Sequence, residues 1–539
     1  MSSPTAARGL DLMGNVTRRV MHRARAVRTR TWVTALFALT VVAALGALAC
    51  RDETFVPAVA TVLAARSTAG FLAVESPDVW LRALDGAAHA ARAADNTALA
   101  LLFSPAARQA ALGFDPADGA QWRAAGLDPG RGAALAWDSR AQADGWPTPL
   151  ALVAAGPPER APLRDWPWRR LASWSFAPLG GVALPGLATW SVDDGPRLAA
   201  DPALRAAFAD LPTGPRLAAY AHTDGIRALL RQRWNGKALA ALDHVTRRLR
   251  AAALVVTPEA IGGRILLTAE GVESLRQVFN QRAPPQPFSP LLPASGLLAV
   301  RGSLNLRDLF DGALAWLPPE WLEARLAVAS SRLGLLAMAG VDWTQLERAF
   351  SGQFVAALTL GEGDGGAALG ASADGAAPPW LLLIGVRDPA LCDAAVLRFT
   401  ERSAARGKPA TAIDVAGARG WQLPEPPVVL VRKDNILLVA ADRAGAAKAL
   451  SGSGGRLVRA EAAAALDGEV VLGAVLQPPT GAASGKRWQD LIAAAPPMAL
   501  RVVGDARGLA LQVPGLQLGA WLQVFAAAVP AVPPKRAPP

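Results

Sequence analysis

The sequence predicts an α+β fold: an N-terminal transmembrane helix followed by two tandem, pseudo-equivalent α+β domains with largely antiparallel sheets. Three observations lead to this prediction. They are an uncharged apolar segment at 32–50, a pattern at 70–87 that recurs at 296–313, and short strand-like runs that alternate irregularly with helical patterns. Irregular alternation with hairpins is typical of α+β folds. A hydrophobic content of 52% with 18% charged residues favours a packed body.

Residues 1–31 are a basic leader. They contain seven arginines against one acidic residue, Asp11, and so account for +6 of the formal net charge of +11. All the remaining residues share a net charge of +5. A surplus this small over so long a chain is a weak field, which argues against nucleic acid as a partner.

The segment Trp32–Cys50 has 19 residues and no charge. As a helix it spans about 28 Å, close to the thickness of a bilayer core. The arginines before it predict a single pass through a bacterial inner membrane, with the N-terminus inside and the body in the periplasm. An alternative remains open, because Ala47–Cys50 resembles a lipobox. In that case Cys50 would be lipidated and the protein would be a lipoprotein anchored there.

An internal duplication organises the rest of the chain. GFLAVESPDVWLRALDGA at 70–87 matches GLLAVRGSLNLRDLFDGA at 296–313, and Gln277-Val278-Phe279 matches Gln523-Val524-Phe525 near the end of each copy. Colinear blocks in one order predict two repeats. The expected units are the repeats 51–282 and 296–528, a Pro-rich linker at 283–295 and a Pro-rich tail at 529–539, the last two extended.

Within the repeats, short runs rich in branched residues and bounded by turn residues predict strands. They lie at 253–257, 264–268, 296–300, 428–431, 435–440 and 469–476. Lys433-Asp434-Asn435, between two such runs, predicts a hairpin.

Helix signals occur at equivalent places in the two copies. Ser76 before Pro77 predicts the start of a helix over 77–93, and Asp201 before Pro202 predicts another. The spacing of the apolar residues that follow predicts which of them face the core. These are Leu81 and Leu84 in the first repeat and Leu306, Leu309 and Phe310 in the second.

A family resemblance is carried by short motifs: Gly113-Phe114-Asp115-Pro116, Ala125–Pro129, Leu198–Leu211 and Leu292-Pro293. With these motifs the chain resembles uncharacterised bacterial envelope proteins that have one N-terminal membrane segment and a duplicated α+β periplasmic body. The resemblance covers most of residues 70–525. It implies the fold and the location and assigns no catalytic residue.

The residue types used for catalysis do not form a recognisable motif. The histidines His22, His89, His222 and His244 make no metal-ligand spacing. We expect His222 to end a strand, Asp243-His244 to lie on a solvated helix face, and Cys392 to be a small core residue. The sequence therefore predicts no catalytic residue, no metal and no cofactor.

Tryptophans and arginines are concentrated in one part of the first repeat. Trp166, Trp168, Arg169 and Arg170 are candidate ligand-binding residues, because tryptophan beside arginine can stack on sugars or peptides. The alternative, favoured by ring size, is that the tryptophans fill a core otherwise made of alanines.

The function predicted from these observations is that of a non-enzymatic, membrane-anchored scaffold, assembly or binding protein of the bacterial envelope, with an envelope protein as partner. One alternative is a carrier of lipid or another apolar ligand in a groove between the two repeats. A second alternative is a hydrolase whose active site is not visible in the sequence.

Overall fold

The computed structural model describes the body of the chain. The described residues are 57–93, 100, 104–112, 114–115, 117–128, 132–138, 142–143, 146–147, 150–154, 163–171, 173–178, 195–212, 217–231, 236–280, 286–292, 297–339, 343–359, 380–425, 427–451, 460–477 and 496–528. The predicted membrane segment 32–50, Cys50 and the tail 529–539 lie outside them. Within the described residues, no helix has the length and apolar character needed to cross a bilayer.

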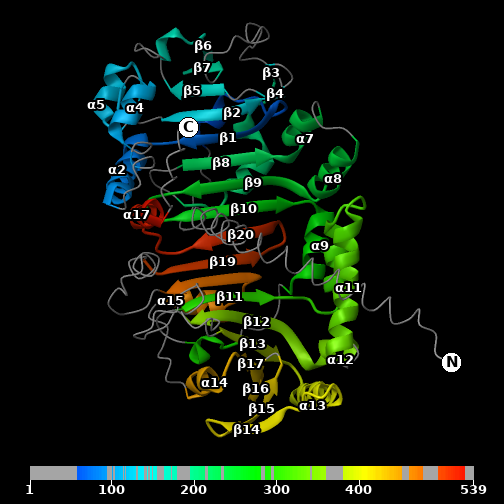
Figure 1. Ribbon diagram of the computed structural model, residues 1–539. Helices are drawn as coiled ribbons and strands as arrows, with labels where there is room; N and C mark the ends of the chain where they lie inside the picture. The colour runs from blue at the N-terminus through cyan, green and yellow to red at the C-terminus, as the bar shows by residue number, and fades with distance from the viewer. Residues whose placement is uncertain are drawn as a thin grey trace, which may run out of the picture.

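In the part of the chain that the structure describes, eighteen strands form one antiparallel sheet (Figure 1). From one edge to the other they are β6 (Arg169–Leu171), β7 (Trp174–Pro178), β5 (Leu150–Ala154), β2 (Ala133–Asp138), β1 (Thr68–Val74), β8 (Leu217–His222), β9 (Leu249–Val256), β10 (Ile261–Leu267), β20 (Gly508–Val513), β19 (Met498–Gly504), β18 (Leu472–Gln477), β11 (Leu297–Ser303), β12 (Phe350–Thr359), β13 (Trp380–Val386), β17 (Ile436–Ala440), β16 (Pro427–Lys433), β15 (Ala418–Pro424) and β14 (Thr411–Val415). A separate hairpin joins β3 (Gln142–Ala143) and β4 (Trp146–Pro147). The predicted α+β class and the antiparallel pairing are confirmed, but the strands form one large sheet instead of a separate sheet in each repeat.

The strand order reads the same outward from the central pair β10–β20. In one direction β10, β9 and β8 are followed by β1, β2 and β5. In the other direction β20, β19 and β18 are followed by β11, β12 and β13. Because β10 and β20 are hydrogen-bonded, the sheet is continuous from the first half of the chain to the second.

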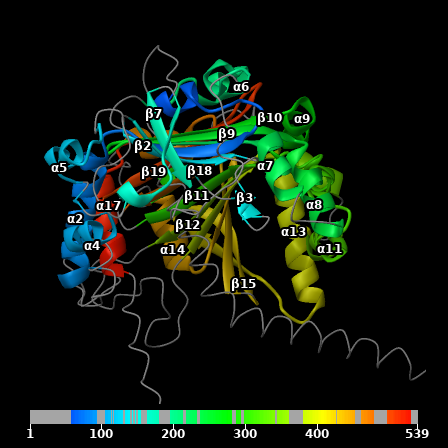
Figure 2. The same cartoon turned by 90° about the horizontal axis from the view of Figure 1, so that it is seen from above.

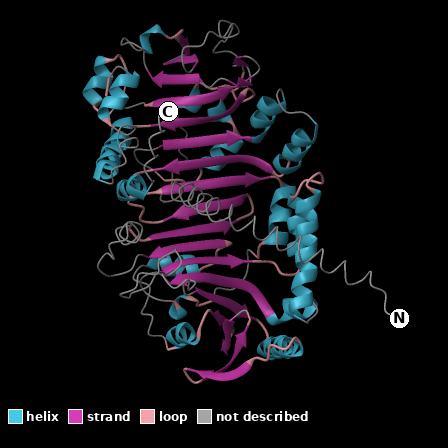
Figure 3. Cartoon of the chain, viewed as in Figure 1, coloured by secondary structure: helices cyan, strands magenta, loops and turns pink. Residues whose placement is uncertain are grey.

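Helices line both ends of the strands (Figures 2 and 3). They are α2 (Pro77–Ala93), α4 (Pro105–Leu112), α5 (Gly119–Ala124), α6 (Pro202–Phe208), α7 (Thr223–Arg231), α8 (Gly236–Thr246), α9 (Ala269–Val278), α10 (Leu309–Trp316), α11 (Leu322–Ala339), α12 (Trp343–Ala349), α13 (Pro389–Ala405), α14 (Arg443–Leu450), α15 (Ala460–Asp467) and α17 (Leu518–Ala528), with short 3₁₀ turns η1 (Ala58–Thr61), η2 (Leu163–Asp165), η5 (Leu198–Ala200) and η6 (Ser289–Leu291). In Figure 2, α2, α4, α5 and α17 stand on one side, and α7, α8, α9, α11 and α13 stand on the other.

Local sequence signals locate these elements correctly. Each of the six predicted strand runs overlaps a strand, and α2 begins at Pro77 as expected. The carboxylate of Asp201 accepts a hydrogen bond from the Ala203 amide at 2.7 Å and so caps α6. In the predicted hairpin, Lys433 pairs with Ile436 across a turn in which Asp434 has φ +50°.

One face of the sheet carries the main core, and we call it the covered face. In the first half, η1, η5 and α6 cover it over residues such as Phe71 and Tyr220. In the second half, η6, α14 and α15 cover it over residues such as Leu383 and Leu438. The register across β10, β20, β19 and β18 places both core clusters on the same side.

Two sequence expectations about the second half are wrong in detail. Leu306 precedes α10, which starts at Leu309, so it is not a helical core residue; its carbonyl accepts a hydrogen bond from Trp343 Nε1 at 2.8 Å. The predicted linker is not extended throughout. It contains η6, and Phe288 and Leu292 are fully buried in the core of the second half. Proline content indicated a boundary, but burial of these two side chains outweighs the extended preference.

The first helix of each half packs on the last helix of the other half. α2 contacts α17, and α10 contacts α9. The close approach uses matching residues. A Cβ at Gly86 would lie 2.9 Å from Nε2 of Gln523, and a Cβ at Gly312 would lie 2.7 Å from Cβ of Gln277. At Gly312 the close atoms include the Cβ and the backbone carbon of Gln277, so glycine is needed there, whereas at Gly86 the close atom is the end of a flexible side chain that can move.

Candidate binding surfaces

The tryptophan cluster predicted from the sequence lies beside the edge strand β6. Trp166 and Trp168 stack with ring centroids 6.0 Å apart, and both are half-buried against a small cluster around Phe114 and Trp122. Arg169 and Arg170, on β6, are exposed. The two rings are therefore neither central core residues nor fully exposed, and their role in ligand binding stays a prediction.

The other tryptophans of that group are separated from this pair. Trp174 is 3% exposed and belongs to the core of the first half, as the core interpretation expects. Trp190 is outside the described residues. The cluster seen in the sequence is thus divided between a core position and a surface position.

The histidines and the cysteine are not brought together. His222 ends β8, as predicted. The expectation of a solvated face at 243–244 is wrong for His244, which is half-buried with Nε2 2.8 Å from the Ala315 carbonyl of α10. Cys392 is fully buried, and burial raises the pKa of its thiol to about 11. Across the described ranges, no group of three or more His, Cys, Asp or Glu side chains could hold a metal.

Buried polar groups gather on the covered face of the second half. Arg301 is 1% exposed and donates from Nη1 to the Leu466 carbonyl at 2.7 Å and from Nη2 to Gln353 Oε1 at 2.8 Å. Burial lowers the pKa of the Arg301 guanidinium, and the negative charge of Asp467 offsets only part of that lowering. Asp467 itself accepts hydrogen bonds from the amide and the hydroxyl of Ser289. These contacts tie β11 to η6 and to the carboxyl end of α15, which is a structural arrangement.

The opposite side of the central strands, which we call the open face, is apolar. In an antiparallel sheet the side away from the core is ordinarily polar. Here the polar side chains of the central strands, Arg264, Arg301, Arg501 and Gln512 among them, are in register with the covered face instead. The open face carries mainly leucine, isoleucine, valine and alanine: Leu72, Val74, Leu217, Ala219, Ala252, Leu254, Ile261, Ile265, Leu509, Leu511, Leu500, Val502, Ala474, Leu476, Leu298 and Val300.

Part of this open face is accessible to solvent. Ile265, next to the junction of the two halves, is 41% exposed, and Leu254 and Leu511 beside it are half-buried. Contact with water does not stabilise the methyl groups of Ile265 and its neighbours, whereas burying them would be favourable in free energy. Ile261 and Leu500 on the same face are buried beneath α2 and α17, so the accessible part is centred on Ile265. An apolar patch that reaches solvent in this way is a candidate binding surface.

Two helix pairs bound the open face at the ends of the central strands. At one end, Trp80 of α2 and Trp521 of α17 pack against a cluster that includes Met498, Leu500 and Leu511. At the other end, Trp316 of α10 packs with α9 residues in a second cluster. In Figure 2 the strands β9 and β10 lie above and between these two helical sides.

The tryptophans of α2 and α17 are sites that the sequence did not single out. Both indole Nε1 atoms are buried and find no hydrogen-bond partner among the described residues. Buried indole N–H groups usually have one. The sequence could not indicate that both lie against one cluster, because no local pattern reports a contact between residues so far apart.

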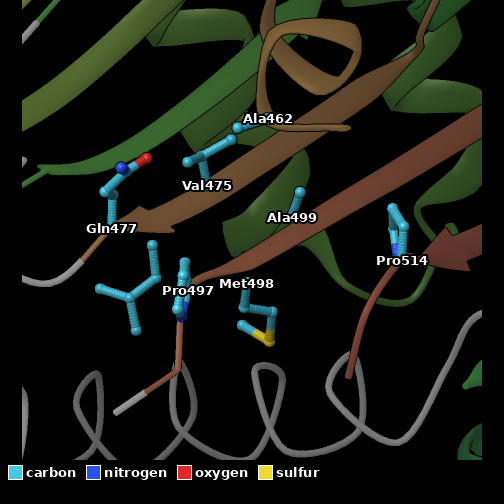
Figure 4. A pocket seen from close by; sticks show the side chains of 8 residues that line it. Ala462, Val475, Gln477, Pro497, Met498, Ala499 and Pro514 are labelled. Atoms are coloured by element: carbon cyan, nitrogen blue, oxygen red, sulfur yellow. The ribbon is translucent and has the colours of Figure 1, made fainter. Parts of the chain in front are cut away.

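A small hollow opens beside this cluster (Figure 4). It is lined by Ala462, Val475, Leu476, Gln477, Pro497, Met498, Ala499 and Pro514. Its roughly 240 Å³ of empty space includes open solvent, so it is a surface depression and not an enclosed cavity. The sulfur-bearing side chain of Met498 and the rings of the two prolines make its wall largely apolar. The hollow adjoins the open face at the end of β18 and β19.

No family model, no curated protein and no solved structure matches the chain.

Proposed function

We propose that this protein is a membrane-tethered envelope protein of the periplasm that binds an apolar chain, such as the acyl chain of a lipid, on the open face. The observation that carries the proposal is the inverted polarity of the central strands, whose charged side chains are in register with the covered face. Contact with an apolar partner stabilises such a strip by roughly 25 cal/mol for each Å² of surface removed from water.

The proposal includes the duplication inferred from the sequence. The strand order that repeats outward from β10–β20 supports two pseudo-equivalent halves, and so do the matched contacts Gly86–Gln523 and Gly312–Gln277. Pseudo-equivalent halves create a site at their junction, and Ile265 and Leu511 lie there on the paired strands β10 and β20.

The membrane segment supplies the reason for choosing lipid as the occupant. The apolar segment ends at Cys50, and the described body begins at Pro57. Seven extended residues reach at most about 25 Å. With that tether, the body is held within one short linker of the bilayer surface, where acyl chains are the most abundant apolar groups.

A photoactivatable phospholipid tests the proposal in the full-length chain. We expect a diazirine on the acyl chain to label β9, β10 and β20, with Ile265→Asp reducing that labelling several-fold because a carboxylate on the strip repels hydrocarbon. Leu397→Asp is the matched control, since Leu397 is 47% exposed on α13 and should leave the labelling unchanged.

Labelling of residues 32–50 provides an internal standard in the same sample. If those residues are labelled while β9, β10 and β20 are not, the acyl-chain proposal is wrong and the tether alone is supported. A reporter active only in the periplasm, fused after Pro539, checks the orientation separately; a silent reporter would contradict the periplasmic location.

A further inference from the structure

A second exposed apolar surface lies on α11, away from the open face. Trp321, Leu322 and Leu326, at and near its N-terminus, are 51%, 63% and 58% exposed. The helix is held on its inner side, where Nη1 of Arg325 donates to the carbonyls of Leu314 and Leu317 at 2.8 Å each. The apolar residues therefore project from a helix whose orientation is fixed.

The middle of the outer side of α11 is small and weakly polar. Ala327, Ala329, Ser330 and Ser331 are exposed. The two serine hydroxyls donate to the Ala327 carbonyl at 3.0 and 2.7 Å, so they are already satisfied within the helix. Removing such a surface from water leaves no polar group without a partner, and small side chains let another helix approach closely.

The surface around the N-terminal end of α11 differs in charge from the surface of α13 beyond its C-terminal end. At the N-terminal end, Glu320 and Glu323 are exposed beside Trp321 and Leu322. Beyond the C-terminal end, α12 packs on α13, which also contacts α11. The outer side of α13 combines Leu397, 47% exposed, with the exposed arginines Arg398, Arg402 and Arg406 and one exposed carboxylate, Glu401, so its charge there is net positive.

We propose that α11 is a homodimer interface, in which α11 of a second copy packs antiparallel about a two-fold axis near Ser330. The 18 residues of α11 span about 27 Å. An antiparallel copy places the acidic, apolar N-terminal end of each α11 near Leu397 and the arginines of the other copy. A two-fold interface must be self-complementary, and this surface satisfies that condition in both apolar character and charge.

The occupant is a second copy rather than a bilayer, because Glu320 and Glu323 flank the apolar residues. Carboxylates are unfavourable at an anionic membrane surface and favourable opposite arginine. This inference uses none of the residues of the open face, so it stands or falls independently of lipid binding.

Disulfide trapping in native membranes tests the interface with the full-length chain. In a Cys50→Ser background, Ser330→Cys places a thiol near the proposed axis, and mild oxidation should give a cross-linked species of twice the chain mass. The control is Arg82→Cys on α2, whose side chain is 60% exposed and which should stay monomeric.

Charge and apolar variants then separate a true interface from random collision. Leu326→Glu, combined with Ser330→Cys, should reduce cross-linking at least about tenfold, whereas Leu326→Met should retain it. Absence of the Ser330→Cys dimer, cross-linking to a different protein, or insensitivity to Leu326→Glu would each overturn the proposal.

Discussion

At the scale of single residues, the covered face depends on charge that is buried without an opposite charge in direct contact. Arg301 is held by one side-chain oxygen and one carbonyl, and its guanidinium lies 5.8 Å from the ring of Phe288. A buried cation of this kind fixes the position of the groups it binds, because each of them would otherwise lose a hydrogen-bond donor in a dry site. The carbonyl it binds ends α15, where the helix dipole favours a cation.

Replacing this arginine should destabilise the protein measurably. We expect Arg301→Met to lower the free energy of unfolding by about 1–3 kcal/mol, because Gln353 Oε1 and the Leu466 carbonyl lose a donor. Arg301→Met with Gln353→Leu should recover part of that loss. Urea denaturation measures both, with Arg82→Met on the surface as a near-neutral control. Equal stability of the single and double variants would contradict the assigned contacts.

Cys392 makes a pH-dependent contribution. Burial raises the pKa of its thiol from the ordinary value of 9.0 to about 11, so the folded chain keeps the proton where the unfolded chain has lost it. The stabilisation is fully present below pH 9 and is lost as the pH rises from 9 to 11. We expect Cys392→Ala to flatten the fall in the melting temperature over this range. An identical fall in both proteins would show that Cys392 is not responsible.

At the scale of elements, local chemistry located the helices and strands, but it did not pair them. The Asp201 cap and the turn at Asp434 involve neighbouring residues, so the sequence alone predicts them. The contact of α2 with α17 joins segments more than 400 residues apart, and no pattern in the sequence predicts it. Leu306 was misplaced for the same reason: its spacing is helical, but its carbonyl is engaged by Trp343.

The two helix crossings should respond differently to the same substitution. A methyl group at Gly312 would lie 2.7 Å from Cβ of Gln277 and 3.0 Å from its backbone carbon, whereas at Gly86 the nearest atom is the end of the Gln523 side chain. We expect Gly312→Ala to cost about 1–3 kcal/mol of stability and Gly86→Ala to be close to neutral. Thermal melting compares them; a greater loss for Gly86→Ala would contradict the packing.

At the scale of the whole molecule, the two halves are joined along a strand pair and by exchanged helix contacts. β10 pairs with β20, and Arg264 bonds to Asp505 across the junction at 2.7 Å. The sequence predicts two domains from a repeat, and the strand order, which reads the same outward from β10–β20, agrees with that prediction without separating the halves into two sheets. The single sheet could not be foreseen, because edge-to-edge pairing of β10 with β20 leaves no local mark.

A chain divided in the Pro-rich segment should therefore reassemble. We expect fragments 1–283 and 284–539, when co-expressed, to purify together in equal amounts. Each alone should aggregate, since an unpaired edge at β10 or β20 and an apolar helix face would be exposed. Size-exclusion chromatography with light scattering measures the outcome. A folded, soluble single fragment would show that the halves are independent domains.

The length of the sheet also determines how far the molecule reaches. Eighteen strands at about 4.8 Å spacing extend roughly 80 Å, more than twice the thickness of a bilayer core. The chain enters through β1, which lies much nearer to the β6 edge than to the β14 edge. With the tether proposed here, the sheet is attached to the membrane close to one of its two edges, the β6 edge. If the strands are stacked along the membrane normal, the β14 edge lies about 60 Å from β1, farther from the bilayer.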